Sequence, residues 1–365
     1  MVDHCSLSGL DLSEHYFREK VRPLLKAHFA SIPISAGLLG DGSEVIGFDT
    51  TMSRDHDWGP RVMLFLQQSD YDGFSNAINA VLQKELPDSF RGFSTLFTTP
   101  NQVAELRANE KTHSGSQSVE LLTAQNFILR QLGFSLKEPI EPADWLTFSE
   151  QKLATIVGGR VFEDEAGLQS VRDRFAYYPK DVWIYLLACQ WTRIEQEEHL
   201  MGRAGYVGDE IGSAIIAARL VRDLMRLCFL MEKQYAPYPK WFGSAFARLR
   251  SAASLSPSLQ LTLHSKNWEE RQTHLSTAYK TVAGLHNALA LTDPMPVSVR
   301  PFHDRPFLVI SMGSFSQALF GQIEDPKVRE IAKRRPIGSI DQFTDNTDLV
   351  SDSSWRPKLR ALYTD

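Results

Sequence analysis

The strongest constraint on this chain is a change in hydrophobic spacing near the segment KEPIEPADW, residues 137–145. Before it, short β-branched and apolar runs alternate with helical stretches. After it, long segments repeat apolar residues at the spacing of amphipathic helices, and runs typical of strands almost vanish. Proline disfavours helix at its own position and just before it. We therefore expect two domains, residues 1–137 and 145–365.

The two parts predict an α+β protein, with a mixed sheet and flanking helices followed by a helical bundle. Strands are expected at 34–39, 62–66, 93–98 and 119–122. Helices are expected at 71–82 and 123–132, the second ending at Gly133, and later at 181–196, 208–234, 268–291 and 315–322. The polar stretch GSIDQFTDNTDLVSDSSWRP near the end is interpreted as a solvated loop or a cover over the bundle rather than a metal site.

Charge and composition exclude several classes of protein. The net charge of −5 gives no general attraction to phosphate backbones, so duplex nucleic acid is not expected as a partner, although a local basic groove stays open. The longest apolar runs are far shorter than the roughly 20 residues that span a bilayer. The first residues lack the layout of a signal peptide. We expect a cytoplasmic protein without a membrane partner, whose three cysteines are reduced.

One segment carries residues suited to chemistry, LLGDGSEVIGFDTTMSRDHDWGPRVMLFL at 38–66. Gly42 and Ser43 follow an apolar strand, and Asp55 and Asp57 come 12 and 14 residues after Ser43. Carboxylates two residues apart on an extended chain project from the same side and can share magnesium ligands. A glycine lets backbone N–H groups approach a phosphate, and a neighbouring serine offers a hydroxyl. The combination suits a nucleoside triphosphate held with its metal.

These residues resemble the motif of the DNA polymerase β-like nucleotidyltransferase superfamily, which includes the enzymes that adenylylate aminoglycoside and lincosamide antibiotics. The resemblance implies that Gly42 and Ser43 hold the triphosphate and that Asp55 and Asp57 hold two divalent ions. The superfamily also has a third carboxylate on a neighbouring strand, for which Glu120 in SVELLT is the best match. Glu120 would complete the metal site or take the proton from the acceptor hydroxyl.

The sequence departs from the superfamily pattern in two ways. Family members usually run directly from the second aspartate into an apolar strand, whereas Trp58, Gly59, Pro60 and Arg61 intervene here before Val62. Because proline cannot donate to a sheet ladder, we expect the aspartates on an edge or bulge just ahead of the strand. His56 also stands between the aspartates, where an apolar residue is common. Both departures point to a changed metal geometry or a degenerate site.

Residues 174–249 are similar to the helical C-terminal region of an uncharacterised family attached to such domains. Arg219 and Lys240 are our candidates in this region for binding the nucleotide or the acceptor. A guanidinium that faces inward from the predicted helix needs a partner such as Asp223 or a phosphate. The alternative for both residues is a structural ion pair or a solvated face.

The leading hypothesis is a magnesium-dependent nucleotidyltransferase that moves a nucleoside monophosphate, AMP from ATP in the first instance, to a hydroxyl of a small molecule and releases pyrophosphate. A second hypothesis changes the acceptor to a protein side chain or an RNA end. A third is a noncatalytic nucleotide-binding protein. The acceptor, the base of the nucleotide and the oligomeric state stay open.

Overall fold

A computed structural model describes residues 7–50, 58–97 and 116–364. The chain divides into two compact units, Met1–Glu138 with Lys152–Ala176, and Pro139–Gln151 with Tyr177–Asp365. Residues 152–176 therefore pack with the first unit, although they follow the proline-rich segment. The predicted α+β class is confirmed, because a four-stranded mixed sheet with helices precedes a largely helical region.

The first unit is built around the sheet of order β7-β2-β1-β8. Strand β1 is antiparallel to both β2 and β8, and β2 is parallel to β7. The elements of this unit are α1 (Gly9–Tyr16), the π-helical segment η1 (Phe17–Val21), α2 (Arg22–His28), β1 (Ile34–Leu38), β2 (Val62–Leu66), α3 (Gln68–Glu85), β3 (Ser89–Phe90), β4 (Phe93–Ser94), β5 (Leu96–Phe97), β6 (Ser116–Gln117), β7 (Val119–Leu122), α5 (Ala124–Leu132), most of α7 (Glu150–Val157), β8 (Arg160–Glu163) and α8 (Leu168–Asp173).

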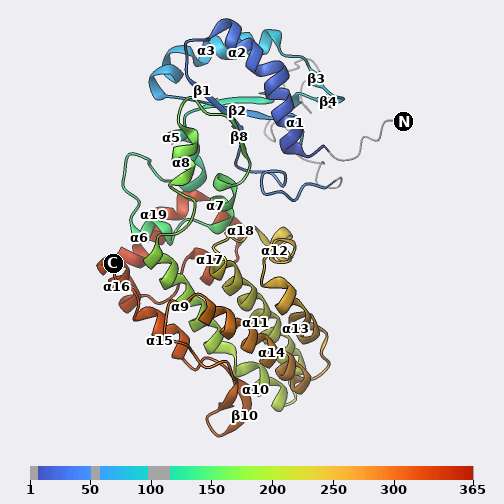
Figure 1. Ribbon diagram of the computed structural model, residues 1–365, viewed down its shortest axis with the longest axis vertical. Coiled ribbons are helices and arrows are strands. Elements are labelled where there is room, and N and C mark those ends of the chain that lie inside the picture. The colour runs from blue at the N-terminus through green and yellow to red at the C-terminus, as the bar shows by residue number, and fades with distance from the viewer. Residues whose placement is uncertain (1–6, 51–57, 98–115, 365) are drawn as a thin grey trace, which may run out of the picture. The chain divides into compact units, whose positions relative to one another are not determined.

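Helices cover both faces of this sheet, as Figure 1 shows, with α2 and α3 on one side and α5 on the other. The first face contributes Ala36, Leu38, Val62 and Leu64 to a core that also contains Leu12 and Tyr16 of α1 and Ile78 and Leu82 of α3. On the second face, the ring of Phe65 meets that of Phe127 of α5 edge to face at 5.7 Å. Burial on both faces explains why β2 reads as a continuous apolar run; all residues of β1 are buried as well, including the polar Ser35.

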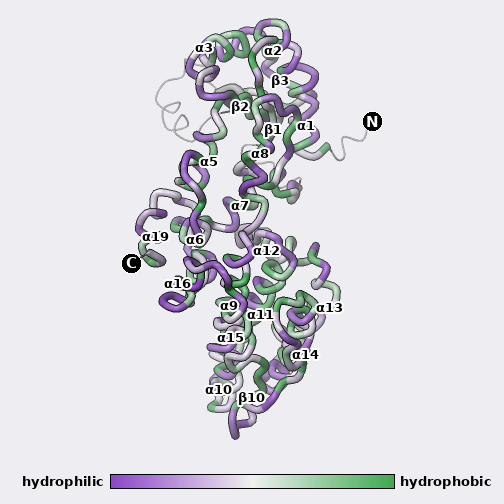
Figure 2. Tube along the Cα trace, turned by 60° about the vertical axis from the view of Figure 1, so that its left-hand side comes forward, coloured by the Kyte–Doolittle hydropathy of each residue, from purple (hydrophilic) through white to green (hydrophobic). Residues whose placement is uncertain are grey.

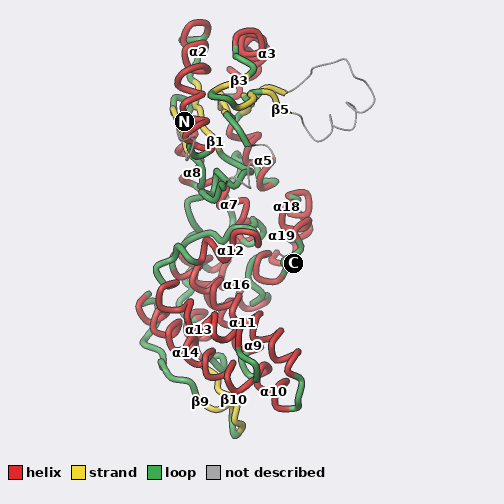
Figure 3. The backbone as a smooth tube through the Cα atoms, turned by 90° about the vertical axis from the view of Figure 1, so that its right-hand side faces the viewer, coloured by secondary structure: helices red, strands yellow, loops and turns green. Residues whose placement is uncertain are grey.

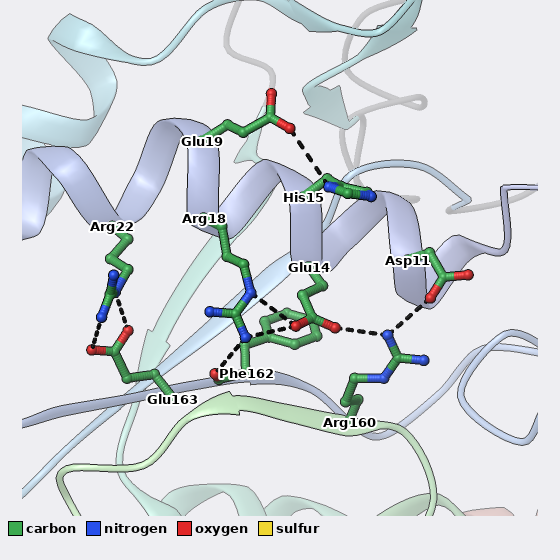
Figure 4. Close-up of polar contacts among 9 residues, drawn as sticks. All are labelled: Asp11, Glu14, His15, Arg18, Glu19, Arg22, Arg160, Phe162 and Glu163. Atoms are coloured by element: carbon green, nitrogen blue, oxygen red, sulfur yellow. Dashed lines mark hydrogen bonds and ion pairs between the residues drawn. The ribbon is translucent and has the colours of Figure 1, made fainter.

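Charged side chains fasten the N-terminal helices to the edge strand β8, as Figure 4 shows. Arg160 of β8 donates to Asp11 at 2.9 Å and to Glu14 at 2.7 Å. One turn further along the helix, Arg18 donates to Glu14 at 2.7 Å, and Arg22 pairs with Glu163. The rings of Phe17 and Phe162 also stack, with 5.8 Å between their centres. The helices thus cover the strand that otherwise forms an open edge.

Most of the predicted strands and helices are confirmed. Strands β1, β2 and β7 lie within a residue of their expected limits, and α5 begins at the N-cap Thr123 and ends at Gly133, which adopts φ +61°. The single strand expected at 93–98 was wrong: β4 and β5 pair with different partners, because the chain turns at Thr95. The expectation that strands almost vanish after residue 145 is confirmed for the described residues apart from three short strands: β8 joins the first sheet, and β9 (Arg300–Phe302) and β10 (Arg305–Val309) form a hairpin.

The second unit is a helical assembly with one hairpin. Its elements are α6 (Pro142–Trp145), the start of α7, α9 (Lys180–Glu197), α10 (Leu200–Tyr206), α11 (Glu210–Met231), α12 (Pro239–Phe246), α13 (Ala252–His264), α14 (Trp268–Ala288), β9 (Arg300–Phe302), β10 (Arg305–Val309), α15 (Ser314–Phe320), α16 (Pro326–Arg334), α17 (Ile340–Phe343), α18 (Thr347–Ser351), η3 (Ser353–Trp355) and α19 (Arg356–Thr364). Helix α9 is buried along most of its length, whereas α16 is mostly hydrophilic (Figure 2). Cys189 and Cys228 are buried free thiols, as expected.

The polar C-terminal stretch forms short helices rather than a loop. Ser339 begins α17 with a capping box, and the amide of Gln342 donates to Leu186 O and to Gln190, both on α9, at 3.0 Å. The hydroxyl of Tyr363 donates to Gly338 O at 2.6 Å. In the part of the chain that the structure describes, none of the helices has the length and apolar character needed to cross a bilayer.

Candidate functional site

The Gly-Ser pair lies in a turn that follows β1 and forms backbone hydrogen bonds with α7 and with the residue before β8. Phe48 N donates to Ser43 O at 2.8 Å, which closes the turn on itself. Gly40 N donates to Thr155 O at 3.0 Å, and Gly159 N donates to Val45 O at 2.6 Å. These backbone bonds join the turn to α7 and to the start of β8. The turn therefore has a fixed position at the end of the sheet where β1 ends.

Glycine is required at position 42 for a local reason. Gly42 adopts φ +144°, and a Cβ at this position would lie 2.7 Å from Glu44 Oε2 and 2.8 Å from an Arg61 Nη atom. Both side chains belong to an ion pair, in which the carboxylate of Glu44 is only 4% exposed. The turn thus combines a conformation that L side chains rarely adopt with close packing around the backbone.

Arg61 joins the turn to the beginning of β2. Its backbone N–H donates to Ser13 Oγ at 3.2 Å, and its guanidinium donates to Asp41 O at 3.3 Å as well as pairing with Glu44. The Nε of Arg61 is buried and has no hydrogen-bond partner among the described residues. A second cation reaches the same turn, because Lys152 Nζ lies 3.1 Å from Asp41 Oδ1. Sequence reasoning did not select either side chain for this site.

The interruption between Asp57 and β2 packs into the first unit. Gly59 and Pro60 are buried, and the carbonyl of Gly59 accepts a hydrogen bond from Ser13 Oγ at 3.4 Å. The ring of Trp58 meets that of Phe93 edge to face at 5.0 Å. Strand β2 itself lies between β7 and β1 and is not an edge strand. Asp55 and Asp57 lie outside the described residues, so the expected edge or bulge at these aspartates stays a prediction.

Glu120 lies on β7, in direct register with Met63 of β2, which in turn is paired with Gly37 of β1. Paired residues share a face of the sheet, so Glu120 lies on the face that α5 covers. Its carboxylate forms an ion pair with Arg130 of α5 at 2.5 Å. The two side chains are 47% and 51% exposed, respectively, so solvent reaches both.

Arg130 connects Glu120 to the Gly-Ser turn electrostatically. Hydrogen bonding to Glu120 raises the pKa of Arg130 above its usual value, and the nearby carboxylate of Asp41 contributes to the same shift. Asp41 immediately precedes Gly42. Because β1 is antiparallel to β2 and β2 is parallel to β7, the end of β1 and the beginnings of β2 and β7 lie at the same end of the sheet. Gly42, Ser43 and Glu120 are thus brought to the same part of the first unit.

Arg219 and Lys240 lie in the second unit. Arg219 pairs with Glu197 of α9 rather than with Asp223, which accepts hydrogen bonds from Gln190 at 3.0 Å and Arg193 at 3.4 Å. Lys240 Nζ lies 5.0 Å from the centre of the Trp241 ring. Both residues thus have the structural contacts that were the alternative to a binding role, and their role toward a nucleotide stays a prediction.

The described residues hold no group of three His, Cys, Asp or Glu side chains arranged as metal ligands. Two of the three predicted ligands, Asp55 and Asp57, are outside those residues. Glu120 is therefore the one member of the predicted triad with a described position.

Comparison with known proteins gives one family match. Residues 145–242 match the family described as "Domain of unknown function (DUF4037)". The match overlaps residues 174–249, which were expected to be similar to an uncharacterised family, and it does not include the Gly-Ser turn or Glu120. No curated protein shows significant similarity to the chain.

Proposed function

We propose that the protein is a magnesium-dependent nucleotidyltransferase that moves AMP from ATP to a hydroxyl of a small molecule and releases pyrophosphate. The observation that carries this proposal is that the Gly-Ser turn, the beginning of β2 and Glu120 lie at the same end of the sheet. Asp57 precedes Val62, the first residue of β2, by a short segment. The Gly-Ser turn, which suits phosphates, thus lies at the same end of the sheet as Glu120. The start of β2, the strand that follows Asp57 in the sequence, lies at this end as well.

The residues of the proposed site at this end of the sheet divide into two groups by their chemistry. Backbone N–H groups near Gly42, the hydroxyl of Ser43 and the cations Arg61 and Lys152 suit the triphosphate. The carboxylates of Asp55, Asp57 and Glu120 suit hard divalent ions such as Mg²⁺. Two such ions would neutralise charge on the phosphates and on the attacking and leaving oxygens of an in-line displacement.

The Glu120–Arg130 ion pair is a weak obstacle to this role. Both side chains are about half exposed, and an exposed pair of this kind contributes only ~0–1 kcal/mol to stability. Glu120 can therefore exchange its guanidinium partner for a cation at little energetic cost. Arg130, once released, carries a charge that can meet a phosphate oxygen instead.

A second candidate is a noncatalytic nucleotide-binding protein, and the ion pair of the buried Glu44 with the partly buried Arg61 favours it. Glu44 neutralises the cation nearest to Gly42, and its carboxylate has almost no contact with solvent. Because the Arg61 side chain is 23% exposed, releasing it costs less than the roughly 3–5 kcal/mol of a fully buried pair, but it leaves Glu44 buried without this partner. A site that cannot release Arg61 has less positive charge to offer the transferred phosphoryl group.

Two measurements on the full chain separate these candidates. Calorimetric titration with ATP and Mg²⁺ tests binding, and pyrophosphate release over a panel of hydroxyl-bearing small molecules tests transfer. Binding together with acceptor-dependent pyrophosphate release supports the transferase. Binding without release over the whole panel supports the second candidate. The absence of Mg²⁺-dependent ATP binding contradicts both.

A further inference from the structure

The hairpin of β9 and β10 is held in a fixed position in the second unit, beside α10 and α14 (Figure 3). The side chain of Gln272 on α14 accepts from Leu308 N at 2.9 Å and donates to Pro306 O at 3.3 Å. After the hairpin, the carboxylate of Glu198 accepts backbone N–H bonds from three consecutive residues, Ile310, Ser311 and Met312. These bonds anchor β10 to α14 and to the residue that precedes His199.

His199 lies against this hairpin with positive groups around it. Its ring stacks on that of Phe302 at 4.1 Å, with 25° between the planes. Burial lowers the pKa of His199, and the charges of Arg203, Arg305 and His303 lower it further. Arg203 lies one turn along α10, and Arg305 is paired with Phe302 in the hairpin. The atom Nδ1 of His199 is buried and has no hydrogen-bond partner among the described residues.

The cations at this hairpin lack acidic partners. Within residues 7–50, 58–97 and 116–364, no carboxylate forms an ion pair with Arg203 or Arg305, although other arginines of the second unit have such partners, including Arg193, Arg219, Arg222, Arg226, Arg271 and Arg360. The carboxylate of Glu198 is occupied by the three N–H groups named above. Of the other acids close to the cluster in sequence, Glu197 pairs with Arg219, and Asp304 lies in the exposed hairpin turn.

We propose that His199, Arg203 and Arg305 form a binding site for a phosphoryl oxyanion, either inorganic phosphate or the phosphate group of an ester. Two guanidinium groups supply the planar donor pairs that match phosphate oxygens. The imidazole of His199, when protonated, adds a third positive charge beside the two guanidinium groups. The stacked Phe302 and the anchored hairpin hold the imidazole and the backbone of Arg305 in place, whereas the exposed guanidinium groups become ordered on binding. This site is independent of the proposed nucleotidyl transfer.

The test uses the full chain with ¹⁵N-labelled histidine and inorganic phosphate as the probe. Phosphate is expected to shift the ring nitrogen signals of His199 and to raise the pKa of His199, because a bound anion stabilises the imidazolium. Arg203→Gln and Arg305→Gln should each weaken binding about tenfold, as the loss of a charge-assisted hydrogen bond implies. Lys280→Gln, which removes an exposed cation on α14, is the control and should leave binding unchanged.

Methyl phosphate and acetate distinguish the sources and the chemistry of the anion. Binding of phosphate alone indicates the free ion, whereas equal or tighter binding of methyl phosphate indicates a phosphate ester. The proposal is contradicted if phosphate leaves the His199 signals unchanged, or if acetate binds as tightly as phosphate. It is also contradicted if Lys280→Gln weakens binding as much as the arginine variants do, since this would indicate a diffuse attraction to any polyanion, RNA included. Unchanged thermal melting of the arginine variants excludes misfolding as the cause.

Discussion

Glu120 and Arg130 form an ion pair across the sheet face that α5 covers, with 2.5 Å between Oε1 and an Nη atom. The pair joins β7, which carries the predicted third carboxylate, to α5. The carboxylate of Asp41 also interacts electrostatically with Arg130. Arg130, which is not part of the motif, is thus in direct contact with the predicted third carboxylate. The consequences of this relationship can be measured separately for stability and for activity.

Glu120→Gln should leave the free energy of unfolding within about 1 kcal/mol of the wild type, because the pair is exposed. In the same variant, acceptor-dependent pyrophosphate release should fall about a hundredfold or more, since a neutral amide is a poor ligand for divalent ions. Urea unfolding and a pyrophosphate assay measure the two effects. Glu330→Gln, which removes the exposed partner of Arg334 in the second unit, is the control. Equal activity in the two variants would remove Glu120 from the site.

Gly42→Ala should destabilise the protein by about 1–3 kcal/mol, because the new Cβ meets Glu44 and Arg61 and the backbone has a positive φ. The matched control is Gly73→Ala, in helix α3, where a Cβ meets no atom within 4 Å. That substitution should stabilise the protein by about 0.5–1 kcal/mol, since alanine favours helix over glycine. Chemical denaturation measures both. A neutral Gly42→Ala would show that the turn is not constrained as described.

Glu150 predicts a pH dependence of stability. Burial, followed by the nearby carboxylate of Asp341, raises the pKa of Glu150 from 4.5 to about 7. Because the folded-state pKa is raised, the unfolded chain ionises first as the pH rises above about 4.5. Stability should therefore fall between pH 4.5 and pH 7, by roughly 3 kcal/mol for this group, and change little above pH 7.

Glu150→Gln should flatten this dependence while keeping an oxygen that accepts the N–H of Ala236. The other titratable groups close to Glu150 are Asp341, Arg226 and the hydroxyls of Tyr177, Tyr178 and Tyr235. Glu324→Gln, an exposed substitution in the same unit, is the control and should keep the slope of the wild type. Urea unfolding at intervals from pH 4.5 to pH 8 measures the slope. An unchanged slope in Glu150→Gln would mean that another group controls it.

The sequence predicted those parts of the fold that depend on local patterns. Strand β2 is a continuous apolar run, β1 is apolar except for Ser35, and α5 has a threonine N-cap and a glycine at its end. Strand β8 was not predicted, because it is short and pairs with Leu38, which is far away in the sequence. The N-terminal helices were also missed, although local signals were present: Ser8 is the N-cap of α1, and Glu14 and Arg18 form an ion pair one turn apart.

For the candidate site, local patterns indicate some of the residues, and the roles of these residues stay predictions. The spacing of Gly42, Ser43 and the strand that carries Glu120 could be read directly from the sequence. Lys152 gave no signal, because α7 reaches the Gly-Ser turn only through the folding of the chain. Arg61 was visible only as part of an interruption of the motif, and its pairing with Glu44 requires knowledge of the turn.

The central claim is most directly tested by acceptor-dependent pyrophosphate release in Asp57→Asn, with ATP and Mg²⁺ and the full chain. The change is nearly isosteric and removes charge that divalent ions require, so release should fall to the background level while thermal melting stays that of the wild type. Asp72→Asn, an exposed substitution on α3, is the control and should keep full activity. Release at the wild-type rate in Asp57→Asn would contradict the account.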